Sequence, residues 1–342
     1  MSTPVLVIGF NRPDLMTKLL TTLEANNVHE LYVSLDGPRP LVESDRVLCE
    51  KTWLIVEHFS SHFNLRMLRH STNLGLAKAV PTAISWFFDQ EPCGIILEDD
   101  CHPVASFFPF CDQLLDHYSS VPEVMMISGS KLNFEQQIPQ DSYSMSRRGH
   151  IWGWATWAES WIHYDQQMSG WGRFRKSDEF KDICNNQAAA ISYWRWTLDN
   201  VEMGRISTWD YQWLYTMWLR GGLSISPPNN LIQNVGFRGD ATNTHMAPDW
   251  IQKLQVGSVV TPLEIKDDLA PDRRSEIWTD NHIYEVGNVY RRVTRVVERV
   301  LNFFYLDRPV KRLLDALRHC ATQVQEHQDD WSCGDKDRVA RH

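Results

Sequence analysis

Short apolar runs alternate with segments of helical periodicity through the first third of the chain. The runs are rich in Val, Ile and Leu and are bounded by turn residues, which favours strands. We expect strands at residues 4–10, 31–35, 65–68, 94–97 and 124–127, and helices at residues 13–25, 41–59 and 76–88. This alternation is typical of an α/β fold, in which helices cover both faces of a mostly parallel sheet.

The pattern changes after about residue 140. Ten of the fifteen tryptophans lie between Trp152 and Trp218, a density that a core alone does not require. From residue 288, apolar residues at helical spacing are mixed with arginines, which predicts a basic amphipathic helix. We therefore expect an α/β half at residues 1–140, a tryptophan-rich half of the same domain at residues 141–287, and a helical extension at residues 288–342. The extension could contact a membrane surface or pack on the core.

The most informative polar feature is a run of three carboxylates, Glu98, Asp99 and Asp100, directly after the apolar strand at residues 94–97. An isolated acidic triplet is usually a solvated turn, but the end of a buried strand is a costly place for three like charges unless a cation compensates them. Mg²⁺ or Mn²⁺ would do so, since these ions prefer oxygen ligands and often share a carboxylate with a substrate's phosphates. Open α/β sheets bind ligands at the carboxyl ends of their strands. The sequence therefore predicts a divalent-metal site here.

Polar side chains also follow the first two predicted strands. The first strand ends in Phe10, Asn11 and Arg12, which places an arginine beside the start of a helix, and both features favour phosphate. The second strand ends at Asp36, whose carboxylate could accept a hydrogen bond from the N–H edge of a nucleobase. Each motif alone is an ordinary turn or surface residue.

The third predicted strand is followed by Asn73, Gly75 and Lys78. Gly75 allows the backbone to approach a ligand closely, and Lys78 could reach a pyrophosphate. Alone, this segment is an ordinary helix cap. Four polar strand ends in sequence order, closing on the three carboxylates, together predict a site for a nucleotide diphosphate.

With these motifs in place, residues 5–245 resemble glycosyltransferases of the GT-A fold, in particular the N-acetylglucosaminyltransferase I type and its bacterial sugar-transferase relatives. Residues 10–13 resemble the nucleotide-binding end of that family's first strand, and Asp36 stands where the family has an aspartate that reads uracil. Glu98-Asp99-Asp100 resembles the family's Glu-Asp-Asp variant of the Asp-x-Asp motif. The resemblance implies that Asp100 binds the metal and that Asp99 contacts the ribose or a neighbouring cation.

The resemblance continues in the tryptophan-rich half. The segment around Trp154, Gly153-Trp154-Ala155-Thr156-Trp157, is similar to the family's acceptor-side segment. Trp209-Asp210-Tyr211-Gln212-Trp213 is similar to a region whose aspartate is the catalytic base, although one more residue separates the tryptophans here. This implies Asp210 as the base and Trp154 and Trp209 as sugar contacts, while ordinary core packing is the alternative for Trp209. The family's later domain is not recognisable.

His245 ends a Gly/Thr-rich loop similar to one found in bacterial relatives. Many metal-dependent enzymes of this fold use a late histidine on the metal or the diphosphate, so the resemblance makes His245 a candidate ligand. The chain has 13 histidines, and a bystander role for His245 stays open.

The function expected from these residues is metal-dependent transfer of a sugar from a nucleotide diphosphate sugar, with a UDP-sugar favoured, to a hydroxyl of a glycan, lipid-linked or protein-linked acceptor. A metal at Asp100 would neutralise the leaving pyrophosphate, and a base at Asp210 on the opposite face implies inversion. A sugar-phosphate nucleotidyltransferase is one alternative, although the glycine-rich phosphate loop usual in that class is missing after the first strand. A non-catalytic carbohydrate-binding protein is another, which would account for the tryptophans but not for the carboxylates.

Net charge and cysteine content limit the binding partners and the cellular compartment that we expect for this protein. A net charge of −9 and a pI near 5.8 argue against non-specific binding of nucleic acid, which depends on basic surface. The seven cysteines contain no Cys-x-x-Cys pair, so neither a disulfide framework nor a zinc site is indicated. The apolar start of the chain is too short for a signal peptide, and no apolar run is long enough to span a bilayer. We expect a cytoplasmic protein, with peripheral contact at the inner face of the membrane through the basic helix as an open alternative.

Overall fold

The computed structural model describes residues 3–237 and 249–287. His245 and the predicted basic helix from residue 288 lie outside these residues. The chain divides into two compact units, Met1–Glu285 and Val286–His342, and the elements below belong to the first. None of the helices in the described part is long and apolar enough to cross a membrane.

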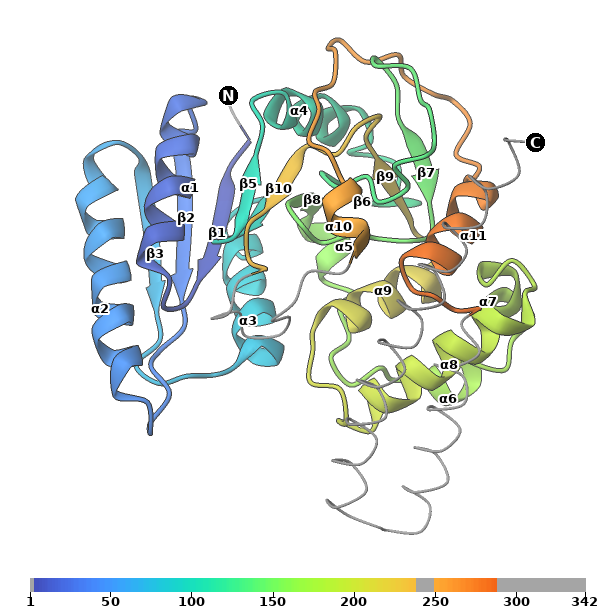
Figure 1. Cartoon of the computed structure of the whole chain (residues 1–342), viewed down its shortest axis with the longest axis horizontal. Coiled ribbons are helices and arrows are strands. Elements are labelled where there is room, and N and C mark those ends of the chain that lie inside the picture. Colours follow the sequence, from blue (N-terminus) through green and yellow to red (C-terminus); the bar gives the residue numbers. More distant parts are fainter. Residues whose placement is uncertain (1–2, 238–248, 288–342) are drawn as a thin grey trace, which may run out of the picture. The chain divides into compact units, whose positions relative to one another are not determined.

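The first unit contains an eight-stranded sheet, counted over the described residues, with strand order β3-β2-β1-β4-β8-β6-β9-β7 (Figure 1). Adjacent strands are parallel from β3 to β4 and between β6 and β9, whereas β8 and β7 run antiparallel to their neighbours. The strands are β1 (Val5–Gly9), β2 (Glu30–Leu35), β3 (Asn64–Arg69), β4 (Cys93–Glu98), β6 (Val124–Ser128), β7 (Ser144–Ser146), β8 (Trp154–Trp157) and β9 (Leu223–Ser226). Two short strands, β5 (Cys101–Pro103) and β10 (Ile232–Asn234), form a separate antiparallel pair.

Helices flank this mostly parallel sheet, which confirms the predicted α/β class. The longer helices are α1 (Pro13–Ala25), α2 (Glu43–His58), α3 (Leu76–Phe88), α4 (Phe107–His117), α8 (Ala188–Glu202), α9 (Asp210–Leu219) and α11 (Arg273–His282). The shorter ones are η1 (Phe59–Ser61), α5 (Ala158–Trp161), α6 (Trp171–Phe174), α7 (Asp178–Ile183) and α10 (Asp249–Lys253). Pro13 and Gly75 stand at the starts of α1 and α3, where the sequence places them, since proline suits a first helical turn and Gly75 has a positive φ of 73°.

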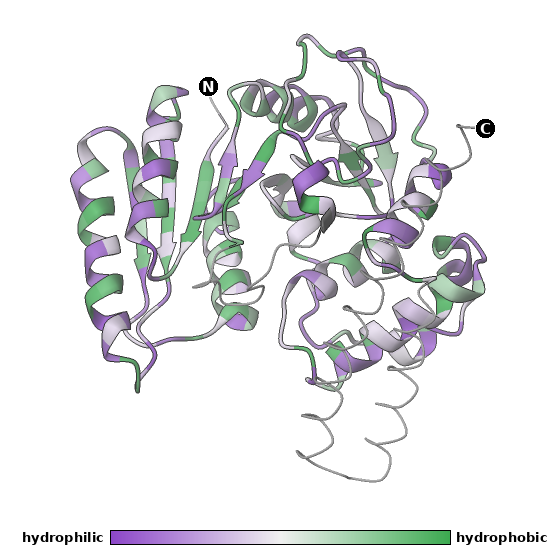
Figure 2. Cartoon of the chain, viewed as in Figure 1, coloured by the Kyte–Doolittle hydropathy of each residue, from purple (hydrophilic) through white to green (hydrophobic). Residues whose placement is uncertain are grey.

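Alternate residues of β1 supply the two cores of the unit. Val5 and Val7 pack with apolar side chains of α1, α2 and α4, whereas Leu6 and Ile8 pack with those of α3 and α9. Figure 2 shows hydrophobic residues along β1 and alternating hydrophobic and hydrophilic residues along α1 and α2. A strand covered on both faces reads as a continuous apolar run, which is why the sequence reveals it.

The strand order creates a topological switch point between β1 and β4. From β1 the chain proceeds outward to β2 and β3, and then returns to place β4 on the other side of β1. Loops leaving the carboxyl ends of β1 and β4 therefore diverge, and this switch point is where open α/β sheets bind ligands. The segment containing Arg12 follows β1, and Asp99 and Asp100 follow β4.

Two buried arginines hold the β7 edge of the sheet to α11. Arg148, with a side chain 1% exposed, makes a two-point ion pair with Asp280 at 2.9 and 2.7 Å. Its guanidinium lies over the rings of Trp194 and Trp218, at 5.4 and 5.3 Å from their centroids. Arg147 pairs with Glu276 in the same way. These pairs attach the last described helix to the core of the unit.

Candidate functional site

A cavity of about 380 Å³ opens at the carboxyl ends of β1, β2 and β4. It brings together residues from both halves of the described chain, so the predicted meeting of distant motifs occurs at one place. The predicted residues that line it are Phe10, Arg12, Asp36, Asn73, Gly75, Glu98, Asp99, Asp100, Trp209 and Asp210.

Three other predicted residues have different positions. The side chain of Asn11 donates to Asp45 at 2.9 Å, Lys78 is exposed in the first turn of α3, and Trp154 is 1% exposed within the core. None of the three is among the residues lining the cavity. Their assignments to phosphate, nucleotide and acceptor binding stay predictions, as does that of His245.

Glu98, Asp99 and Asp100, here called the acidic cluster, receive their counter-charge from Arg12. One guanidinium nitrogen of Arg12 lies 2.5 Å from Asp99 Oδ1, and another donates to Asp100 Oδ2 at 2.8 Å. The side chain of Asp99 is only 1% exposed, whereas that of Asp100 is 16% exposed. The cation that the sequence requires at this strand end is therefore supplied, among the described residues, by an arginine.

The pKa values within the acidic cluster reflect this arrangement. Burial raises the pKa of Glu98, and the neighbouring charges of Asp100 and Asp99 raise it further. Burial also raises the pKa of Asp99, while the charge of Arg12 opposes the rise. Burial alone would lower the pKa of Arg12, but Asp99 and Asp100 outweigh it and keep that pKa above its ordinary value. A raised pKa at Glu98 reduces the repulsion that three full charges would create.

Asp100 is the member of the acidic cluster best suited to a divalent cation. It is partly exposed, lines the cavity and offers hard oxygen donors. No group of three or more His, Cys, Asp or Glu side chains within residues 3–237 and 249–287 is arranged to hold a metal ion. Mg²⁺ or Mn²⁺ thus fits in the mode where one carboxylate shares the ion with a ligand's phosphates.

The carboxylate of Asp36 is tied to the loop before α3. Oδ1 accepts from the backbone N–H groups of Gly37 and Leu74, both at 2.8 Å. Oδ2 accepts from the Gly75 N–H at 3.0 Å and the Asn73 side chain at 2.9 Å. A carboxylate has about four lone-pair sites, so these bonds occupy its accepting capacity. Asp36 shapes the β2 side of the cavity, and its predicted contact with a base stays a prediction.

Replacing Asp36 with alanine should lower the free energy of unfolding by about 3 kcal/mol or more, because three backbone N–H groups lose their acceptor at roughly 1–3 kcal/mol each. Urea denaturation measures this loss, and the exposed Asp116 on α4 offers a control, Asp116→Ala, expected to change little. Nucleotide binding by the same variant tests base recognition. Unchanged stability with a lost preference among UDP, GDP and CDP would instead identify Asp36 as a base contact.

Arg39 is a cavity residue that the sequence analysis missed. Its guanidinium lies 5.6 Å from the centroid of the Phe10 ring and forms a two-point pair with Asp45 at 2.5 and 3.0 Å. Asn11 donates to the same carboxylate. The position of Arg39, three residues after Asp36, is the only signal in the sequence, and it does not distinguish a cavity residue from a surface one.

Asp210 is the first residue of α9 and lines the cavity. The hydroxyl of Thr208 donates to its carboxylate, and Thr208 also lines the cavity. Burial raises the pKa of Asp210, whereas the hydrogen bond from Thr208 lowers it. A carboxylate with a raised pKa holds a proton more firmly, which suits a general base.

A group of closely packed tryptophans positions α9 against the sheet. The ring of Trp209 stacks on that of Trp154 at 5.9 Å between centroids and 24° between planes. Trp213 packs against Trp154 and Trp161 at 5.8 and 5.3 Å. Trp154 lies on β8 and pairs in register with Ile96 of β4, two residues before Glu98. This aromatic core therefore connects Asp210 to the strand that carries the acidic cluster.

The remaining wall of the cavity comes from residues that were not among the predicted site residues. Trp152 packs edge-on against Phe237 and stacks on Trp250 of α10 at 5.9 Å. Gly236 lies so close to the acidic cluster that a Cβ there would collide with the carboxylate of Asp100. Asn234 Oδ1 accepts from the Gly236 N–H at 2.8 Å and fixes this approach.

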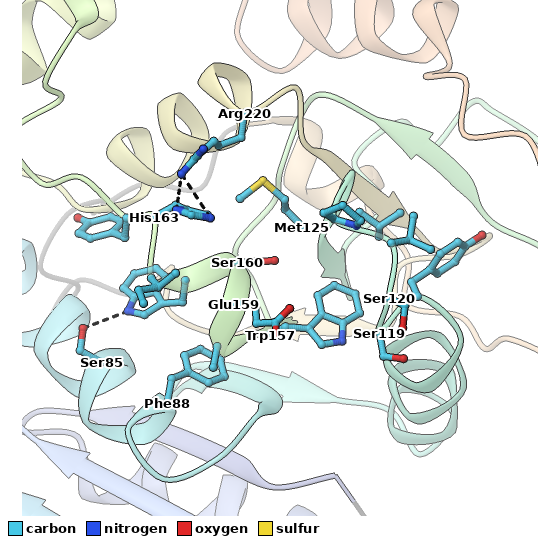
Figure 3. A pocket seen from close by; sticks show the side chains of 18 of the residues that line it. Ser85, Phe88, Ser119, Ser120, Met125, Trp157, Glu159, Ser160, His163 and Arg220 are labelled. Atoms are coloured by element: carbon cyan, nitrogen blue, oxygen red, sulfur yellow. Dashed lines mark hydrogen bonds between the residues drawn. The ribbon is translucent and has the colours of Figure 1, made fainter.

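A second and larger cavity, of about 960 Å³, lies near the amino-terminal ends of β4 and β6, and Figure 3 shows the side chains that line it. Trp157, on its wall, pairs with Cys93 at the amino-terminal start of β4. His163 and Arg220 form a hydrogen-bonded pair there, and Ser85 accepts from Trp161. Because the acidic cluster and Asp210 line the smaller cavity instead, we take the smaller one as the candidate functional site.

Comparisons with known proteins add the following. No protein-family model matches the sequence, and no curated protein matches it either. Among solved structures, HddC from Yersinia pseudotuberculosis is similar at 11% identity with a TM-score of 0.27, over 46% of this chain and 77% of that one. A second is described as a "Putative Glucose-1-Phosphate Thymidylyltransferase from Bacillus anthracis", with 8% identity, a TM-score of 0.31, and coverage of 53% and 81%. TM-scores this low carry no argument about chemistry.

Proposed function

We propose that this protein transfers a sugar from a nucleotide diphosphate sugar to an acceptor hydroxyl. The observation that carries the proposal is the cavity at the switch point, which joins Arg12 and the acidic cluster to Asp210 from the other half of the described chain. One side of the cavity suits a diphosphate, and the other offers Asp210 as a general base.

The donor would bind along the ends of β1, β2 and β4. Arg12 and Asp100 line the part of the cavity suited to the diphosphate. Phe10 and Asp36 line the part where the nucleobase would lie. Mg²⁺ or Mn²⁺ bound at Asp100 would stabilise the charge that develops on the departing phosphate oxygens.

The acceptor hydroxyl would lose its proton to Asp210. Its carboxylate is partly buried, its pKa is raised, and Thr208 holds its orientation. Trp152 is partly exposed on the same cavity wall, backed there by the buried Trp209, and this apolar wall would exclude water that otherwise hydrolyses the donor. A base facing the anomeric carbon from the side opposite the leaving group produces inversion. A UDP-sugar is the favoured donor because of the resemblance seen in the sequence.

Sugar-phosphate nucleotidyl transfer is the second candidate function. The name of one similar structure, a thymidylyltransferase, agrees with nucleotidyl transfer better than with sugar transfer. The TM-score of 0.31 is too low for this similarity to support either function. In this alternative the cavity would hold a nucleoside triphosphate and a sugar phosphate. The two functions differ in which bond breaks, and this difference can be measured.

Incubation with labelled UDP-, GDP-, CMP- and dTDP-sugars and Mn²⁺ separates the candidates. Slow metal-dependent release of free sugar, and its transfer when glycan acceptors are added, supports the proposed function. When labelled pyrophosphate is added, cleavage of the nucleotide sugar to sugar 1-phosphate and nucleoside triphosphate, with the label in the triphosphate, supports nucleotidyl transfer instead. No turnover and no nucleotide binding would contradict both, and would favour a carbohydrate-binding protein.

Replacing Asp100 with alanine should abolish Mn²⁺-dependent binding of UDP while the protein stays folded. The reason is that Asp100 is partly exposed, lines the cavity and makes a single contact with Arg12. Calorimetry with both proteins measures the effect, and circular dichroism verifies the fold. The matched control is Asp89→Ala, which removes a carboxylate from the wall of the larger cavity and should leave UDP affinity unchanged. Metal-dependent affinity that survives Asp100→Ala would contradict the metal assignment.

A further inference from the structure

Arg12 holds the position where a divalent cation would have to bind. Its guanidinium contacts Asp99 with two nitrogens, at 2.5 and 3.3 Å, and Asp100 with one, at 2.8 Å. The side chain is 20% exposed and lies in the same cavity as the acidic cluster. A metal at Asp100 would therefore meet a carboxylate oxygen that is already paired, with a positive charge beside it.

We propose that Arg12 competes with the divalent cation for Asp100, so that metal binding depends on the arrival of a diphosphate. This inference rests on the proposed function for its ligand, a nucleoside diphosphate with Mn²⁺ or Mg²⁺. Without the diphosphate, Arg12 pairs with both Asp99 and Asp100 and repels the ion. With it, Arg12 gains phosphate oxygens as new partners and releases Asp100 to the metal.

The contacts of Arg12 are unequal in a way that permits this exchange. Asp99 is almost fully buried and receives two of the three contacts, so its pairing with Arg12 stays in place. Asp100 is partly exposed and receives a single contact. A small rotation of the guanidinium about its Asp99 contacts therefore frees Asp100 without leaving a buried charge unpaired.

The charges explain why the diphosphate is needed. A divalent ion placed beside an arginine is repelled strongly in a partly buried site, where the effective dielectric constant is low. The phosphates of a nucleoside diphosphate bring negative charge that attracts both cations, and arginine suits phosphate by its planar set of donors. Binding of metal and diphosphate would then be cooperative, and by linkage each raises the affinity for the other by the same factor.

Titration with Mn²⁺ alone tests the competition directly. Free Mn²⁺ is measured by electron paramagnetic resonance in the absence of nucleotide, for the wild type and for Arg12→Gln, which keeps a polar side chain but removes the charge. We expect Mn²⁺ to bind Arg12→Gln at least tenfold more tightly than the wild type. The gain should disappear in the double variant Arg12→Gln, Asp100→Asn, which lacks the carboxylate that Arg12 releases.

Arg39→Gln is the matched control. Arg39 lines the same cavity but pairs with Asp45 rather than with the acidic cluster, so its removal should leave the affinity for Mn²⁺ alone unchanged. Adding UDP should raise the Mn²⁺ affinity of the wild type at least tenfold and that of Arg12→Gln by a smaller factor. If Arg12→Gln does not fold, Arg12→Lys is used. Lysine keeps the positive charge but lacks the planar set of donors that contacts both carboxylates, so it should bind Mn²⁺ more tightly than the wild type, by a smaller factor than expected for Arg12→Gln.

Two results would overturn the inference. The first is equal affinity for Mn²⁺ alone in the wild type and the Arg12 variant, and the second is wild-type Mn²⁺ affinity that UDP does not change. Failure of the proposed function looks different. In that case no nucleotide sugar is turned over and no nucleoside diphosphate binds, while the Mn²⁺ titrations of the two proteins still decide whether Arg12 competes for Asp100.

Discussion

Replacing Asp210 with asparagine is expected to reduce sugar transfer by a factor on the order of 10² to 10⁴. Asparagine keeps the size of the side chain and can still pair with Thr208, but it cannot take the acceptor's proton. Affinity for UDP should be preserved, because Arg12, Asp36 and Asp100 are untouched. Steady-state turnover and calorimetric UDP binding on one preparation measure the two effects. Glu202→Gln, an exposed change on α8, is the control for turnover.

The pH profile offers an independent view of the same base. Burial raises the pKa of Asp210 and Thr208 lowers it, so turnover should fall as the pH drops through that raised pKa. Thr208→Val removes the lowering contribution and should move this acid limb to higher pH. Near-normal turnover in Asp210→Asn, or a product that keeps the donor's anomeric configuration, would contradict direct displacement with Asp210 as base.

Replacing Asp280 with alanine should lower the free energy of unfolding by about 3–5 kcal/mol, the usual cost of leaving one partner of a buried ion pair uncompensated. Arg148 would stay buried between Trp194 and Trp218 without its carboxylate. Urea denaturation measures the loss. Asp178→Ala breaks an exposed pair with Lys181 and should cause no measurable change.

A double variant distinguishes charge from packing at this position. Arg148→Met with Asp280→Leu removes both charges and fills part of the space, so it should recover much of the stability lost in Asp280→Ala. A double variant no more stable than the single one would show that shape and hydrogen bonding, rather than the unpaired charge, dominate the loss.

Much of the fold follows from local patterns in the sequence. The strands at β1 and β4 are apolar on both faces, so their residues form unbroken runs that a single sequence displays. Pro13 and Gly75 carry conformational preferences that place the starts of α1 and α3. Because the carboxyl ends of parallel strands meet at one edge, the polar residues that follow them could be predicted to converge.

The pairing of side chains within the site could not be predicted in this way. Three adjacent carboxylates require a cation, but the sequence does not show whether that cation is a metal ion or an arginine from elsewhere in the chain. Arg12 is 87 residues from Asp99 in the sequence. The four partners of Asp36 lie in its own turn and in a loop whose approach depends on the packing of β2 and β3. Likewise, spacing alone does not show that Trp209 and Trp154 are both 1% exposed core residues and that only Trp209 also lines the cavity.

The closely packed tryptophans make the intrinsic fluorescence of this protein sensitive to ligands in the candidate site. Trp209 lines the candidate site and lies within 6 Å of Trp154, which in turn lies 6.4 Å from Trp161, so excitation absorbed by one indole passes readily to the others. A nucleotide that quenches Trp209 would therefore dim the emission of the whole group. Ligand binding, and the order in which metal and nucleotide arrive, can thus be followed by intrinsic fluorescence in the unlabelled protein.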